Sequence, residues 1–144
     1  MRSLRERNTA ATGMTFDQML ERIRYEGAYP TRERAEAVTH AVLEGLGRQL
    51  AGDERVALAA CLPVEAALTF TAQAPDTGQL TGWGFVKDLA ARTGGTPATA
   101  RWDAGAVLAT VARLTDPGLL DRVLGRLPSG YALLFGRAEL IQAA

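Results

Sequence analysis

Residues 31–70 read TRERAEAVTHAVLEGLGRQLAGDERVALAACLPVEAALTF, and residues 96–135 read TPATARWDAGAVLATVARLTDPGLLDRVLGRLPSGYALLF. The two stretches align without a gap at an offset of 65, with eleven identities in forty positions. Self-similarity of this kind is typical of a duplicated structural unit. The shared residues are apolar, small or turn-forming, so they predict packing and leave the chemistry open.

Capping motifs mark the first two helices of each unit. Thr15 with Gln18 three residues later forms the pattern of a capping box, and Thr81 stands at the corresponding place in the second copy. Thr31 and Thr96 are typical N-caps for the second helix, and apolar residues then recur at helical spacing. We expect the equivalent leucines of these second helices, Leu43 and Leu108, to be buried.

The third helices are expected to start near Asp53 and near Asp116-Pro117 and to end at the shared Leu-Pro. Because proline is favoured at the start of a helix, short helices are expected over residues 64–70 and 129–135. Five of their residues are expected to fold back on the bundle: Leu68, Phe70, Leu133, Leu134 and Phe135. No run alternates with the period of a strand.

The sequence therefore predicts an all-α bundle of about eight helices in two tandem pseudo-symmetric repeats. Residues 1–13 are interpreted as a flexible basic arm that contributes nothing to folding. Repeat 1 covers residues 14–70, a linker covers 71–79, and repeat 2 covers 80–144, with both repeats in one compact domain. The second to fourth helices of the two repeats are expected to superpose.

The composition is that of an ordinary globular protein. The 144 residues are 47% hydrophobic and 22% charged, with a net charge of zero. No apolar run has the length of a membrane span, and the first residues lack the apolar segment of a secretory signal. The single cysteine, Cys61, is interpreted as a small structural residue near a helix end, which agrees with a reducing compartment. We expect a cytoplasmic protein.

The combined pattern is similar to a known family. A capped helix is followed by a helix that begins T-x-x-x-A and carries A-V-L, and then by L-P-x-x-x-x-L-x-F, twice in this chain. In these features the sequence resembles the bacterial domain-of-unknown-function family numbered 2267, over roughly residues 14–70 and 80–137. The resemblance implies an all-helical fold with a repeated unit, and it brings no catalytic residue.

One polar constellation is a candidate site. Glu36, His40 and Glu44 are spaced four apart and share a helix face, so they are candidates for holding a metal or sensing pH. The chain has no second histidine to complete a zinc set, and the second repeat has no counterpart of the three. We interpret them as an exposed polar face. No catalytic, cofactor-binding or metal-binding residue is predicted.

Three large aromatic residues break the repeat. Trp83 corresponds to Asp17, Trp102 to Ala37, and Tyr131 to Ala66. One alternative is that these side chains fill the seam between the two units, since each half of a duplicated fold must bury a face. The other is that they form a partner surface, because exposed aromatic side chains are favoured at interfaces.

The sequence thus favours a small cytoplasmic interaction or structural protein that contacts a protein partner or a second copy of itself. The alternative is a nucleic-acid- or ribosome-associated factor that uses Arg2, Arg5 and Arg7 of the arm together with the more basic second repeat. An enzyme is the least supported class, because no nucleotide-binding or hydrolase motif is present.

Overall fold

The computed structural model describes residues 14–137, and this part of the chain forms eight helices and no strand. They are α2 (Phe16–Gly27), α3 (Arg32–Gln49), α4 (Asp53–Cys61), α5 (Val64–Thr71), α6 (Gly82–Thr93), α7 (Pro97–Leu114), α8 (Pro117–Arg126) and α9 (Tyr131–Leu134). The all-α prediction is confirmed. The predicted arm, with Arg2, Arg5 and Arg7, lies outside the described residues.

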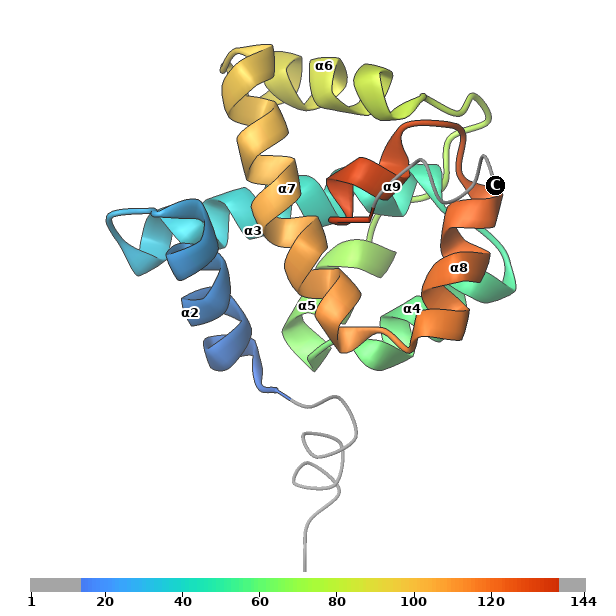
Figure 1. Ribbon diagram of the computed structural model, residues 1–144, viewed down its shortest axis with the longest axis horizontal. Coiled ribbons are helices and arrows are strands. Elements are labelled where there is room, and N and C mark those ends of the chain that lie inside the picture. The colour runs from blue at the N-terminus through green and yellow to red at the C-terminus, as the bar shows by residue number, and fades with distance from the viewer. Residues whose placement is uncertain (1–13, 138–144) are drawn as a thin grey trace, which may run out of the picture.

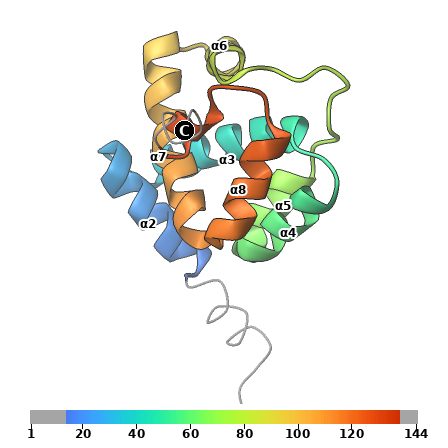
Figure 2. The same ribbon diagram turned by 45° about the vertical axis from the view of Figure 1, so that its right-hand side comes forward.

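The helices pack around a core between α3 and α7, the two longest helices. α3 contacts α2, α5, α6 and α7, while α7 also contacts α2, α6 and α9. In Figure 1, α7 crosses in front of α3, with α6 along the top of the molecule and α4, α5 and α8 toward the lower right. The turned view in Figure 2 shows α2 and α8 on opposite sides of α7.

The threonine caps form as the sequence predicts. The Thr15 hydroxyl accepts from the amide of Gln18 at 3.1 Å, and the Gln18 side chain accepts from the Thr15 amide at 2.9 Å, which completes the capping box. Thr31, Thr81 and Thr96 likewise accept from the third amide of α3, α6 and α7, and Thr96 with Thr99 forms a second capping box. Each cap satisfies an amide that the first turn of a helix leaves unpaired.

The last predicted helix is shorter than expected. Residues 129–135 were predicted as one helix, but α9 covers only Tyr131–Leu134 because Gly130 adopts a left-handed φ of 99°. Gly130 lies against Gly82, where an added Cβ would come within 2.5 Å of the Gly130 carbonyl carbon. The Gly82 amide donates to the Ser129 carbonyl at 2.8 Å. Residues 129–130 therefore serve as a turn that receives the start of α6.

The core contains the residues that the repeat predicts. Leu43 and Leu108 are both fully buried, and the exposed fractions of Phe70 and Phe135 are 0% and 2%. Leu68 and Leu133 were also expected to fold back on the bundle, and for them the prediction is wrong, since they are 64% and 53% exposed. Each lies two residues before its buried phenylalanine, on the outward side of a short helix.

One arginine does structural work that the apolar pattern does not reveal. The Arg55 guanidinium lies 5.2 Å from the centre of the Phe70 ring and donates to the Leu50 carbonyl at 2.9 Å. It also donates to the carbonyls of Gly47 and Gln73. Because the last carbonyls of a helix lack intrahelical partners, this one cation satisfies backbone groups at the ends of both α3 and α5. No helix of residues 14–137 combines the length and hydropathy of a membrane span.

Candidate functional site

Two side-chain hydrogen bonds join the end of α2 to α7. The indole N–H of Trp102 donates to the Gly27 carbonyl at 2.9 Å, and the Tyr29 hydroxyl donates to Asp103 Oδ1 at 2.5 Å. These partners are 74 and 75 residues apart in the chain, so the bonds connect the two halves of the molecule. We call this contact of Gly27 and Tyr29 with Trp102 and Asp103 the clasp.

The turn after α2 has the shape that the clasp requires. Ala28 adopts a left-handed conformation with φ 54° and ends the helix, and its amide and the Tyr29 amide bond back to carbonyls of the last turn. The Tyr29 ring then folds over Gly27, where an added Cβ would lie only 2.1 Å from a ring carbon. A glycine at position 27 is therefore needed for the tyrosine to reach Asp103.

Electrostatics keep the tyrosine a donor. Burial and then the hydrogen bond to Asp103 raise the pKa of Tyr29 well above its ordinary value. The phenol is protonated at neutral pH and donates to the carboxylate, an arrangement that makes a strong hydrogen bond. One oxygen of Asp103 is thereby fixed in position.

A cleft of about 220 Å³ opens beside the clasp, between α3, α6 and α7. Its lining residues are Arg34, Ala37, Val38, Ala41, Val42, Leu89, Thr93, Gly95, Thr99 and Asp103. Val38, Val42 and Leu89 belong to the buried core and give the cleft an apolar floor. Arg34 supplies a positive charge and Asp103 a negative charge, so the cleft has charged groups of both signs beside apolar side chains.

The two tryptophans are half-exposed, but they are held differently. Trp83 lies in the first turn of α6, as predicted, and is 59% exposed, with the Lys87 ammonium 5.9 Å from its ring centre. Trp102 is 58% exposed although its indole N–H is bonded within the clasp. One edge of Trp102 therefore contributes to the contact between the two halves while much of the ring faces solvent, and its role in a partner surface stays a prediction.

Tyr131 is not a surface residue, and this candidate is corrected. It is 1% exposed, its hydroxyl donates to the Leu80 carbonyl at 2.9 Å, and its ring meets Phe85 edge-on at 5.6 Å. Burial raises the pKa of Tyr131 above its ordinary value. All of these contacts lie within the second half, so Tyr131 fills the core there.

The Glu36, His40 and Glu44 constellation is only partly assembled. His40 Nε2 lies 3.5 Å from a Glu36 oxygen, and His40 Nδ1 lies 2.9 Å from the Thr69 hydroxyl. Thr69 in turn donates to the Glu65 carbonyl, so its hydroxyl is occupied as a donor. Within residues 14–137, no group of three or more His, Cys, Asp or Glu side chains is placed to hold a metal ion.

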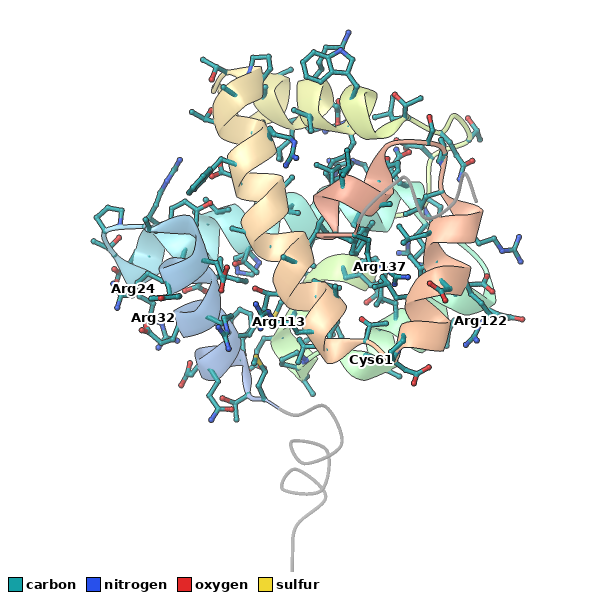
Figure 3. The ribbon with its side chains drawn as sticks, in the orientation of Figure 1. Arg24, Arg32, Cys61, Arg113, Arg122 and Arg137 are labelled. Atoms are coloured by element: carbon teal, nitrogen blue, oxygen red, sulfur yellow. The ribbon has the colours of Figure 1, made fainter. Side chains whose placement is uncertain are left out.

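Most arginines of the described chain are already paired. Ion pairs with carboxylates engage Arg22, Arg24, Arg32, Arg92, Arg113, Arg126 and Arg137. Figure 3 shows Arg24 and Arg32 at the α2 and α3 side of the molecule and Arg122 on α8 at the opposite side. The arginines of residues 14–137 are thus dispersed and do not line one face.

Sequence reasoning missed the clasp and the cleft, although one signal for them was present. Asp103 interrupts the apolar face of α7 at the position that aligns with Val38 of α3. A carboxylate at a position facing the core needs a polar partner. The partner, Tyr29, stands in a turn far away in the sequence, and nothing in a single chain pairs the two.

Comparison with known protein families gives a match over most of the chain. The model of the family described as "Uncharacterized conserved protein (DUF2267)" matches residues 16–134. This chain therefore belongs to the DUF2267 family, as the resemblance in its repeats indicated. A comparison with curated protein sequences found no match.

Proposed function

We propose that this member of the DUF2267 family is a small helical protein-interaction or structural protein whose contact surface includes Trp83 and Trp102. The observation that carries the proposal is the exposure of the two tryptophans, at 59% and 58%. Tryptophan is enriched among the residues that contribute most binding energy at interfaces, and exposed apolar surface is a marker of interaction sites.

The way in which Trp102 is held supports this proposal. Its indole N–H is bonded to the Gly27 carbonyl, so the ring has a defined orientation before any partner arrives. A side chain that is already ordered loses less conformational entropy on binding. Trp102 therefore suits the role of a rigid anchor, while Trp83, near Lys87, adds a cationic and aromatic surface at the start of α6.

The proposal is tested with two tryptophan variants, of which Trp83→Ala leaves the clasp intact and Trp102→Phe removes its bond to the Gly27 carbonyl. Trp83→Ala removes an exposed ring, and Trp102→Phe keeps an aromatic ring but loses the indole N–H. Tyr25→Ala is the matched control, since Tyr25 is a 78% exposed aromatic residue in the last turn of α2. Sedimentation velocity measures self-association, and affinity capture from the native extract measures partner binding.

Weaker self-association or partner capture with Trp83→Ala and Trp102→Phe, but not with Tyr25→Ala, supports the proposal. Equal behaviour of all three folded variants and the parent contradicts it. The alternative of a nucleic-acid-associated factor is separated by nuclease treatment before capture. Loss of partners after the treatment favours that alternative.

We further propose that the two halves of the chain are copies of one structural unit. The helices follow in the same order, with 12, 18, 9 and 8 residues in α2 to α5 and 12, 18, 10 and 4 residues in α6 to α9. The matching burial of Leu43 and Leu108 supports the duplication. Superposition of residues 31–70 on 96–135 in an experimental structure tests it, and different helix arrangements would contradict it.

A further inference from the structure

We propose that the cleft between α3, α6 and α7 binds a small zwitterion of the amino-acid type. Its ammonium group would pair with Asp103, its carboxylate with Arg34, and its aliphatic body would lie on the floor of the cleft. This inference does not depend on the tryptophan surface.

The first support is a pair of opposite charges that the protein leaves unpaired. Within residues 14–137, neither the Arg34 guanidinium nor the Asp103 carboxylate makes an ion pair, although both line the same cleft. Asp103 accepts through Oδ1 from Tyr29, which leaves its second oxygen for another donor. A ligand that carries both charges satisfies both residues, whereas a simple cation or anion would be repelled by one of them.

The second support is the hydrogen-bonding state of the two threonines in the lining. The Thr93 hydroxyl donates its proton to the Leu89 carbonyl at 2.8 Å, and the Thr99 hydroxyl donates to the Thr96 carbonyl at 3.0 Å. Both hydroxyls thus use their proton within the protein, but the Thr99 oxygen also accepts from the Thr96 amide at 3.0 Å in the α7 capping box, so the Thr93 oxygen is the better acceptor for a ligand. The two hydroxyls stand close together, because a Cβ built on Gly95 would lie 2.9 Å from the Thr99 oxygen and 3.6 Å from the Thr93 oxygen.

Together with Asp103, the Thr93 hydroxyl makes the polar part of the cleft beside α6 and α7 an acceptor surface. A primary ammonium group has three N–H donors and no acceptor, so its hydrogen-bonding capacity is complementary to that surface. Arg34 is the donor-only group of the cleft, and its planar guanidinium matches a carboxylate. The positions of donors and acceptors thus assign the two ends of the ligand.

The size of the cleft limits the ligand. A volume of about 220 Å³ is below the range of roughly 300–1,000 Å³ that is usual for drug-sized ligands. Ala37 and Ala41 of the lining, which are exposed and half-buried respectively, offer hydrocarbon to a short aliphatic chain. The class that fits is a small aliphatic amino acid or an amino acid with its two charged groups at opposite ends of a chain.

The test uses the full chain, labelled with ¹⁵N, and three zwitterionic probes: valine, leucine and 6-aminohexanoate. Amide resonances of Leu89, Thr93, Thr99 and Asp103 are followed during titration. 3-Methylbutylamine and 4-methylpentanoate are the matched control ligands, since each keeps the chain of leucine and lacks one charge. We expect at least one zwitterion to shift these amide resonances. If leucine binds, it should bind at least about tenfold more tightly than either control ligand.

Variants assign the charges. Asp103→Asn keeps an acceptor for Tyr29 but removes the negative charge, and Arg34→Gln removes the positive charge of an exposed residue. Each is expected to weaken binding of the zwitterion by at least about tenfold. Arg101→Gln, on α7 but outside the cleft lining, is the matched control and is expected to leave binding unchanged. If Asp103→Asn fails to fold, Arg34→Gln carries the test.

Three results would overturn the proposal. The first is the absence of shifts at these four amides with all three zwitterions at millimolar concentration. The second is binding of the amine or the carboxylate control as tight as that of leucine. The third is binding that survives Arg34→Gln unchanged, because the cleft would then not recognise the carboxylate.

Discussion

Removal of the Tyr29 hydroxyl is expected to destabilise the protein through the clasp alone. Tyr29→Phe keeps the ring over Gly27 but deletes the donor to Asp103, a bond of 2.5 Å between a neutral hydroxyl and a carboxylate. Hydrogen bonds to charged groups contribute about 1.5–3 kcal/mol. Because Asp103 is only half-buried, water can replace part of the lost bond, so we expect a cost of about 1.5–2 kcal/mol.

Urea unfolding followed by circular dichroism measures this cost. The midpoint should fall while the slope stays constant, because the variant changes stability and not the surface exposed on unfolding. The melting temperature should drop by about 4–8 °C for a chain of this size. Tyr25→Phe is the control, since Tyr25 is 78% exposed, and it should stay within about 0.5 kcal/mol of the parent. If Tyr29→Phe is no less stable than Tyr25→Phe, the clasp does not hold the two halves together.

Three further predictions concern the core, the close contacts and alkaline pH. Leu43→Ala and Leu108→Ala should each cost about 2–5 kcal/mol in urea unfolding, and curves that overlay the parent would remove the repeat-core argument. Ala28→Gly should stabilise the protein by about 0.5–1 kcal/mol, because glycine adopts the left-handed φ of 54° without strain. Gly47→Ala should destabilise the protein, because the added Cβ would lie 2.1 Å from a carbonyl oxygen of α5. Melting temperatures of the two variants should therefore change in opposite directions. Folding raises the pKa of Tyr29, so the contribution of this tyrosine to the free energy of unfolding is fully present below its ordinary pKa of 10.0 and is lost as pH rises above that value. When the pH is raised from neutral to above 10.0, the Tyr29→Phe variant should therefore lose less stability than the parent.

The elements of the fold that depend on local signals could be predicted from the sequence. The Thr15 and Thr96 caps, the helices that follow them, and the burial of Leu43 and Leu108 depend on residues close together in the chain or on helical spacing. The length of the short helix after Leu127-Pro128 was overestimated, because the sequence pattern does not show that Gly130 packs against Gly82. That contact joins residues 48 apart and can be seen only in three dimensions.

The site depended on long-range contacts and was predicted only in part. The repeat comparison singled out Trp83 and Trp102 because they are large where the first repeat is small or polar, and both are exposed. The same comparison selected Tyr131, which is buried, since a size difference says nothing about the direction in which a side chain points. The Tyr29 bond to Asp103 brings together a turn and a helix, and only the folded chain reveals it.

The most direct test of the proposed contact surface uses the fact that the chain has only two tryptophans. Protein labelled with 5-fluorotryptophan gives one fluorine resonance for Trp83 and one for Trp102, assigned with Trp83→Ala. We expect both resonances to shift or broaden as a captured partner, or excess unlabelled protein, is added. Complex formation shown by sedimentation with both resonances unmoved would contradict the account, because the contact surface would then lie away from the tryptophans.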